Sequence, residues 1–427
     1  MKHKKTLKIF ILIFTLFTSP SCIQKNVHKC DILASHPYDI RRVSDGVEWD
    51  DIDCLKAEKF CREAVNLYPD NNKYLYLYGR VLLKQKKCNK ALECFHQSAK
   101  NNYPAAVYAI GKIYELGDCV DHNYKLALKW YRIAADLKYP IAINNIGYMY
   151  DKGKGVKQSY DLAIKWYRKA AQLGNSLAMN NIGWMYYKGY GVDQNYKNAM
   201  DWLHRAAKKG CSLAMTNIGV IYEKGHGVKQ DYKAAFDWYQ RAVKKGNAMA
   251  MNNIGWLYHE GDGVKQNYKT ALDWLHKAAK KDCALAMSNI GLIYENGDGV
   301  KQDYKTAFNW YKRSAQNGSA LAMNNIGWMY HEGNGVEKDY KTALDWLHKS
   351  ANKGNFQAMN NIGWMYENGN GVSKDYIKAY ECYNHAAKKG NIQAMYNISN
   401  MYRYGKGVQK DISMAKKWYY KAKNAEE

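Results

Sequence analysis

The stretch AMNNIGWLYHEGDGVKQNYKTALDWLHKAA, residues 250–279, holds one copy of the pattern that decides the fold. Its first part places Ala250, Ile254 and Tyr258 four residues apart, and its second part repeats small and aromatic residues at the same helical period. A Gly-x-Gly-Val sequence separates the two parts, and glycine there ends the first helix through backbone angles closed to other residues. The stretch therefore predicts two helices joined by a glycine turn.

This pattern recurs along the chain without an insertion. An Ile-Gly pair returns every 36 residues, and Ser399 takes the place of the glycine in the last copy. The glycines are Gly111, Gly147, Gly183, Gly219, Gly255, Gly291, Gly327 and Gly363. One helical hairpin cannot bury its own apolar face, so neighbouring hairpins must stack. The sequence thus predicts an all-α protein, a right-handed α/α superhelical solenoid of helix-turn-helix repeats with an extended concave groove.

The repeats resemble those of the Sel1-like repeat family, relatives of the tetratricopeptide repeats. The shared signature is Ala-x-x-x-Ile-Gly-x-x-Tyr, then Gly-x-Gly-Val, then Tyr-x-x-Ala-x-x-Trp, followed by Ala-Ala. On this resemblance we expect nine such repeats in residues 105–427. Residues 51–104 resemble plain tetratricopeptide units, because they lack the longer turn. Residues 22–50 are expected to form an N-terminal linker segment.

A longer period of 72 residues overlies the repeat. Trp-Leu-His at Trp202, Trp274 and Trp346 alternates with Trp-Tyr at Trp166 and Trp238. We interpret this alternation as the trace of a duplication that copied repeats in pairs.

The first residues have the character of a secretory signal peptide. Four lysines precede position 9, residues 9–17 are apolar except for Thr15, and small residues stand at Ser19 and Ser21. We therefore expect residues 1–21 to be removed and the protein to be exported to the periplasm, the cell envelope or the medium. Cys22 is a candidate lipidation site, but Pro20 departs from the usual lipoprotein sequence, so its acylation stays open. This lipid anchor would be the only membrane contact.

Cysteine usage fits an exported protein. Of the ten cysteines, six crowd between Cys30 and Cys119, and three are scattered singly further on. Extracytoplasmic proteins keep disulfides. One or two disulfides near the N-terminus are therefore expected, although the sequence does not reveal their pairing.

The charge is strongly basic, at +25 with a pI near 9.4. Such a balance suits either a polyanionic partner or lysines that coat helices for solubility. The lysines are spread through the repeats rather than gathered in one run, and export removes the usual RNA targets. We therefore favour the second interpretation and do not expect nucleic acid as a partner.

The face of the first helices opposite their packed seam is the candidate partner-binding groove. It carries asparagine three residues before the glycine and, in several repeats, tryptophan just after it. The candidate residues are Asn180, Trp184, Asn252, Trp256, His259, Glu260, Asn324, Trp328, His331, Glu332, Asn360 and Trp364. Indole offers apolar area to a partner, and the amide can bond a peptide backbone. The alternative, that the tryptophans pack in the core and the asparagines cap helices, remains open.

No catalytic constellation is apparent. His259-Glu260 begins like a zinc-protease motif, but Gly263 stands where the second histidine belongs. The resemblance makes β-lactam hydrolysis a candidate activity, because some relatives bind or hydrolyse β-lactams. The Ser-x-x-Lys pairs at Ser350 and Ser413 match one of its motifs, but the companion motifs are missing.

We therefore expect a non-enzymatic, monomeric scaffold without cofactor or metal. It would bind a protein or an extended peptide segment in the groove of its repeats, in envelope biology or host interaction. A β-lactamase-like hydrolase and a polyanion-binding repeat protein are the alternatives.

Overall fold

The computed structural model describes residues 29–35 and 51–426. The expected signal peptide, Cys22 and most of the expected linker lie outside the described residues. Within them the chain forms 22 helices and no strand. None of these helices is both long and apolar enough to cross a bilayer.

The chain divides into two compact units, Met1–Lys209 and Gly210–Glu427. The first unit contains α1 (Lys29–Ala34), α2 (Cys54–Leu67), α3 (Asn72–Lys84), α4 (Cys88–Lys100), α5 (Pro104–Leu116), α6 (Tyr124–Asp136), α7 (Pro140–Lys152), α8 (Tyr160–Gln172), α9 (Ser176–Lys188) and α10 (Tyr196–Lys208). The second contains α11 (Ser212–Lys224), α12 (Tyr232–Val243), α13 (Ala248–Glu260), α14 (Tyr268–Ala279), α15 (Ala284–Asn296), α16 (Tyr304–Gln316), α17 (Ala320–Glu332), α18 (Tyr340–Asn352), α19 (Phe356–Asn368), α20 (Tyr376–Lys388), α21 (Ile392–Tyr404) and α22 (Ile412–Glu426).

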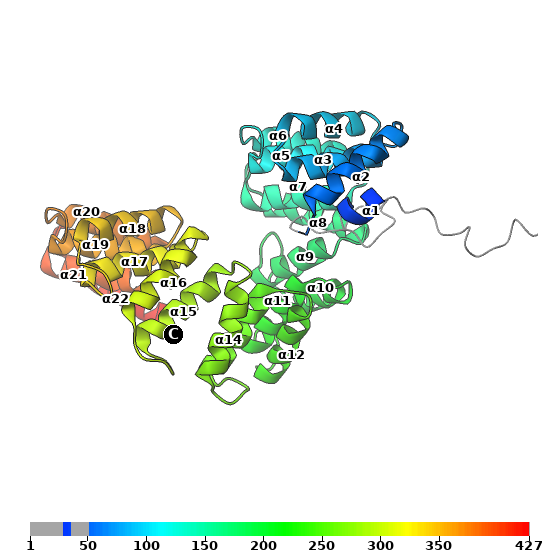
Figure 1. The fold of residues 1–427 in the computed structure, drawn as a ribbon. Coiled ribbons are helices and arrows are strands. Elements are labelled where there is room, and N and C mark those ends of the chain that lie inside the picture. The colour runs from blue at the N-terminus through cyan, green and yellow to red at the C-terminus, as the bar shows by residue number, and fades with distance from the viewer. Residues whose placement is uncertain (1–28, 36–50, 427) are drawn as a thin grey trace, which may run out of the picture. The chain divides into compact units, whose positions relative to one another are not determined.

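Within each unit, consecutive helices pair into hairpins, and each hairpin packs on the next (Figure 1). From α5 onward, the odd-numbered helix is the first helix of a repeat and the even-numbered helix is the second. The predicted fold class, an α/α solenoid of helix-turn-helix repeats, is confirmed.

The glycine turn ends the first helix as the sequence predicts. α15 stops at Gly297, whose positive φ of 82° lets its N–H reach the carbonyl of Ile293. The second glycine of the turn, Gly299, has a φ of 67°, and a Cβ there would lie 2.3 Å from Cβ of Tyr268 in the preceding repeat. Asp303 then caps α16 by accepting from the N–H of Thr306. Both the backbone angle and the approach of the neighbouring repeat therefore require glycine at 299.

The glycine that recurs every 36 residues brings the two helices of a hairpin together. At Gly291 a Cβ would lie 2.7 Å from the ring of Tyr311, which is fully buried on α16. In the next repeat, Gly327 meets Leu347 in the same way, at 2.8 Å. The side chain of the second helix thus fills the space that the missing glycine side chain leaves.

The 72-residue alternation has a physical role in addition to the history we inferred from it. In four repeats the tyrosine of the second helix donates its hydroxyl proton to a glutamate at the end of the first helix, as Tyr311 does to Glu295 at 2.5 Å. The same pair forms between Tyr239 and Glu223 at 2.7 Å. Burial, followed by the hydrogen bond to Glu295, raises the pKa of Tyr311. Repeats with leucine on the second helix have tyrosine or histidine in place of that acid: Tyr187, His259 and His331. Leucine has no group that could donate a hydrogen bond to a buried carboxylate. The repeats with leucine on the second helix therefore also lack the acid on the first helix.

Two disulfides lie in the N-terminal part of the chain, as the clustering of cysteines predicts. Cys30 of α1 pairs with Cys61 of α2, and Cys88 at the start of α4 pairs with Cys119 in the turn after α5. Both link residues 31 positions apart. Cys119 replaces the second glycine of its turn and keeps the positive φ, at 73°.

Candidate partner-binding groove

The predicted asparagines form part of a ladder of amides. Asn252 donates to Asn253 at 3.1 Å and accepts from Asn289 of the next repeat at 2.9 Å. Asn361 likewise donates a hydrogen bond to Asn324, and Asn397 donates one to Asn360, each at 2.9 Å. In the first unit, Asn181 donates to Asn144 at 3.1 Å. We call these hydrogen-bonded asparagines of successive repeats the asparagine ladder.

The two asparagines of each pair differ in exposure. The predicted residues Asn180, Asn252, Asn324 and Asn360 are buried, with 3–7% of their surface exposed. The residue after each of them, such as Asn253 or Asn325, is usually half-buried at the surface. Only the first asparagine of each pair was predicted to be a site residue; the second was not. The repeated Asn-Asn-Ile-Gly sequence was the available signal.

The predicted tryptophans lie between core and surface. All four are half-buried. Trp256 stacks on His259 with ring centroids 4.6 Å apart, and Trp328 stacks on His331 at 4.8 Å. Trp364 packs edge-on against Trp328 at 5.8 Å and also contacts the buried core. Trp184, in the first unit, stacks on Tyr187 at 5.0 Å. Each ring therefore combines a packed face with some solvent exposure.

The histidines of the predicted His-Glu pairs link adjacent repeats. His259 Nδ1 lies 2.8 Å from Glu260 Oε1, and its Nε2 lies 3.0 Å from Asp298 Oδ2 in the next glycine turn. His331 makes the corresponding contacts to Glu332 at 2.8 Å and to Asn370 at 3.0 Å. Both glutamates are exposed, whereas His331 is only 4% exposed. The buried histidine is therefore a structural link, and its glutamate is the accessible member of the pair.

An open groove of about 360 Å³ crosses α15, α17 and α19 in the second unit. We call it the amide groove. It is lined by Leu292, Glu295, Asn296, Asn324, Asn325, Trp328, Gln357 and Asn361. It brings together the predicted residues Asn324 and Trp328. The other predicted residues do not line it, although Asn360 and Trp364 lie on α19 beside it.

A row of exposed apolar side chains belongs to the same helices. The second residue of each of four successive first helices is exposed by 38–47%, namely Leu213, Met249, Leu285 and Leu321. The corresponding residue of α19, Gln357, lines the amide groove. The row, on α11, α13, α15 and α17, therefore occupies the same helix position as one residue of the groove. This row of side chains was not predicted from the sequence, because a single apolar residue at the start of a helix is ordinary in any one repeat.

The structure bears on two kinds of site weighed from the sequence, a metal site and a Ser-x-x-Lys site. No cluster of three or more His, Cys, Asp or Glu could hold a metal there. Ser350, from one Ser-x-x-Lys pair, is fully buried and donates to the carbonyl of Ala320 at 2.6 Å. Its hydroxyl is therefore inaccessible to a substrate.

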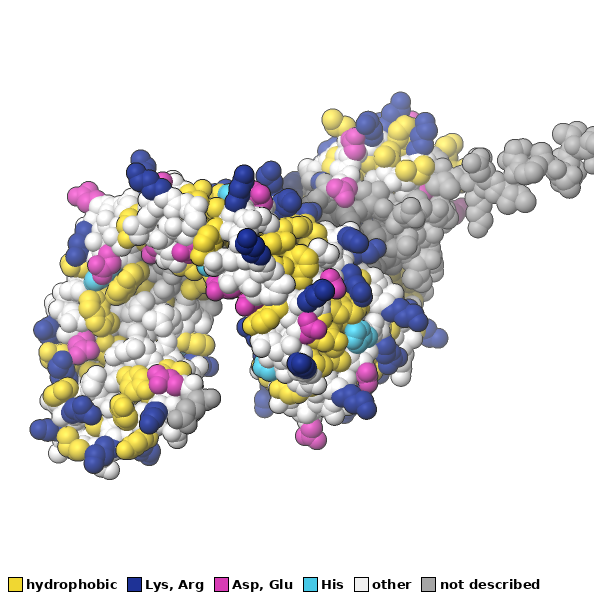
Figure 2. Space-filling view, turned by 90° about the horizontal axis from the view of Figure 1, so that it is seen from below, with side chains coloured by type: hydrophobic (Ala, Val, Ile, Leu, Met, Phe, Trp, Pro, Cys, Tyr) yellow, Lys and Arg dark blue, Asp and Glu magenta, His cyan; other side chains and the backbone are white. Residues whose placement is uncertain are grey.

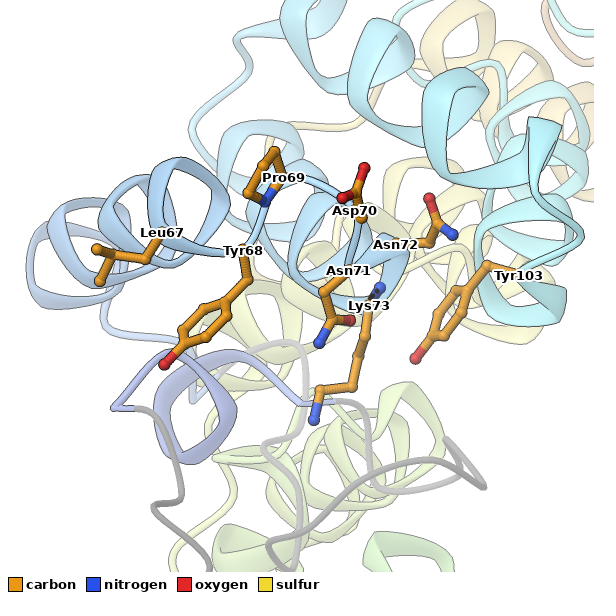
Figure 3. A pocket seen from close by; sticks show the side chains of 8 residues that line it. All are labelled: Leu67, Tyr68, Pro69, Asp70, Asn71, Asn72, Lys73 and Tyr103. Carbon is orange, nitrogen blue, oxygen red and sulfur yellow. Dashed lines mark hydrogen bonds between the residues drawn. The ribbon is translucent and has the colours of Figure 1, made fainter.

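A further hollow lies at the turn between α2 and α3 in the first unit (Figure 3). Tyr68, Lys73 and Tyr103 are among its lining residues. Lys73 pairs with the buried Asp31, so the positive charge of this hollow is already neutralised. Other basic side chains are spread over the surface visible in Figure 2 instead of forming one patch.

Comparison with known proteins agrees with this architecture. A Sel1 repeat protein from Oxalobacter formigenes is 33% identical, with a TM-score of 0.51 over 59% of this chain and 100% of its own. A protective antigen of uropathogenic Escherichia coli with an SLR fold is 29% identical over 86% of this chain and 79% of its own, with a TM-score of 0.46. An immunity protein, Pa5087 from Pseudomonas aeruginosa, is 20% identical over 50% of this chain and 81% of its own, with a TM-score of 0.42. No curated protein matches significantly.

The profile of the Sel1 repeat family matches ten consecutive segments. They are residues 74–103, 104–139, 140–175, 176–211, 212–247, 248–283, 284–319, 320–355, 356–391 and 392–426. The first of these segments corresponds to the hairpin of α3 and α4, which lacks the glycine turn. With matched repeats over most of its length, the chain belongs to the Sel1 repeat family.

Proposed function

We propose that this protein is an exported, non-enzymatic scaffold that holds an extended segment of a partner protein in its amide groove. Sel1 repeat proteins generally mediate protein–protein interactions. The observation that carries the proposal for this chain is the amide groove itself, where amides, Trp328 and Leu292 share one open surface.

The spacing of the amides suits a peptide backbone. Packed helices lie ~10 Å apart, and an extended chain rises about 3.3 Å per residue, so successive repeats would meet roughly every third residue of a bound segment. Each carboxamide has two N–H groups and two acceptor lone pairs. Within the groove, the bond from Asn361 to Asn324 uses one of the two N–H groups of Asn361. The amides would hold the backbone, while Trp328 and Leu292 would bury apolar side chains.

Export is supported by the signal-like N-terminal sequence and by the two disulfides. Disulfides persist in oxidising compartments and are rare in the cytosol. We propose a monomer that contacts a membrane only if Cys22 carries a lipid.

Two rival functions have simple tests. A β-lactamase-like hydrolase would turn over nitrocefin, and the buried hydroxyl of Ser350 argues against it. A polyanion-binding protein would be retained on heparin and released steeply with salt.

Co-purification from native lysate tests the groove. Trp328→Ala is expected to weaken capture of the partner, because a hot-spot truncation costs about 2 kcal/mol, roughly thirtyfold in affinity. Since this ring also packs against His331, a second variant, the pair Asn296→Glu with Gln357→Glu, changes only exposed lining positions. This pair is expected to lose the same partner while its circular dichroism stays that of the parent.

The matched control is Asn309→Glu with Asn352→Glu, at exposed positions on α16 and α18. This control should retain the partner. Equal capture by the control, the folded groove variants and the parent would disprove binding in the amide groove.

A further inference from the structure

The first unit contains a second groove with a different chemistry, about 520 Å³ in volume, across α5, α7 and α9. We call it the basic groove. It is lined by Tyr108, Lys112, Pro140, Ile141, Asn145, Leu173, Gly174, Asn175, Ser176, Leu177 and Lys209. The volume is in the range of ordinary ligand sites.

The charges in this lining are all positive. Lys112 and Lys209 line the groove, and no aspartate or glutamate does. Lys112 lies 3.1 Å from Glu115, but that carboxylate also accepts from the Tyr131 hydroxyl at 2.6 Å and is only 8% exposed. Among the described residues, Lys209 takes part in no ion pair. The groove therefore presents one shared and one uncompensated ammonium group.

The walls of the basic groove are apolar. Leu173 is 44% exposed, and Ile141 and Leu177 are half-buried beside it. Between these side chains and Lys112, the amide of Asn145 donates to the hydroxyl of Tyr108 at 3.4 Å. A ligand with both apolar and anionic groups would cover these apolar side chains and pair with the lysines at the same time.

The amide groove provides the contrast within the same chain. The position after the repeat glycine is Lys112 in the basic groove but Leu292 and Trp328 in the amide groove. The amide groove also contains Glu295, whereas the basic groove contains no acid. The two grooves therefore differ in charge and in the side chain at this position.

We infer that the basic groove binds an acidic peptide segment whose carboxylates lie on both sides of an aliphatic side chain. The carboxylates would pair with Lys112 and Lys209, and the aliphatic side chain would cover Leu173, Ile141 and Leu177. Lys112 lies on α5, whereas Lys209 follows α10 and its ammonium group lies near Gly174, between α8 and α9. At ~10 Å per repeat, the acidic residues would be separated by at most about six extended residues. This interaction is independent of the amide groove.

Fluorescence anisotropy with the full chain tests the inference. The probe is a fluorescein-labelled peptide, Glu-Asp-Gly-Leu-Val-Gly-Asp-Glu. Lys112→Glu with Lys209→Glu is expected to weaken binding at least tenfold. Leu173→Ser, at an exposed wall position, is expected to weaken it several-fold without changing the charge. The control pair Lys129→Glu with Lys165→Glu makes the same charge change at exposed positions on α6 and α8 and should bind like the parent.

Several results would overturn the inference. The first is absence of probe binding to the folded parent. Equal losses in the control pair, or equal affinity for a peptide with serine in place of leucine and valine, would indicate nonspecific attraction of polyanions. Sedimentation can give a further contrary result. The parent would be a dimer that binds no probe, and Lys112→Glu with Lys209→Glu would dissociate it. The occupant of the basic groove would then be a second copy of the chain.

Discussion

Replacing Gly291 with valine is expected to destabilise the second unit by about 3 kcal/mol, at the upper end of typical overpacking effects. Even one added carbon would lie 2.7 Å from the Tyr311 ring, and valine adds two more. Tyr311 cannot move aside without losing its bond to Glu295. The small gain in helix propensity over glycine does not compensate for this overlap. Thermal and urea unfolding followed by circular dichroism measure the change.

The last repeat provides an internal comparison. Ser399 stands in the glycine position there, and its hydroxyl donates to the carbonyl of Ala415 at 2.7 Å. The corresponding residue of the second helix, Tyr419, is 43% exposed and does not fill the space beside it. Ser399→Gly should therefore destabilise by only about 1–2 kcal/mol, through the lost hydrogen bond and the lower helix propensity of glycine. If Gly291→Val is as stable as the parent, close helix approach is not the reason for the 36-residue glycine.

The second large effect is expected from the disulfide between Cys88 and Cys119. Replacing both cysteines with serine should lower the free energy of unfolding of the first unit by about 3–4 kcal/mol, the chain-entropy value for a closed loop of this length. Both residues lie in one unit, so unfolding of the second unit should not change. The oxidised proteins would be unfolded in urea, and amide hydrogen exchange would report the stability of the first unit and of the second unit separately.

Cys94 is the matched control for this experiment. Among the described residues Cys94 has no disulfide partner, and burial raises the pKa of its thiol to about 11, so it is a protonated, packed side chain at neutral pH. Cys94→Ser should therefore respond little to oxidant or reductant beyond a small packing loss. The disulfide account fails if the paired variant unfolds like the parent under oxidising conditions.

Most of the fold could be predicted from sequence because the determinants lie within one repeat. The distance from Gly291 to the Tyr311 ring and the turn at Gly297 both depend on residues of one hairpin, and that hairpin is copied along the chain. Periodicity is therefore sufficient to identify the helices, their turns and their stacking.

The site was less predictable because its contacts cross between repeats. Asn289 meets Asn252, 37 positions away, and His259 meets Asp298, 39 positions away. Inspection of one repeat does not show which of two adjacent asparagines the next helix covers. The disulfide pairing was hidden for the same reason, since Cys88 and Cys119 lie in different hairpins.

Site-specific photo-crosslinking tests the central claim most directly. A benzoylphenylalanine at Asn296, which is exposed and lines the amide groove, would be compared with one at Asn309, exposed on α16. Both proteins would be illuminated with the co-purified partner, and the crosslinked peptides identified by mass spectrometry. The account predicts that position 296 crosslinks one continuous segment of the partner and that position 309 does not. Equal crosslinking from both positions, or from 309 alone, would show that the partner binds outside the amide groove and would contradict the proposed function.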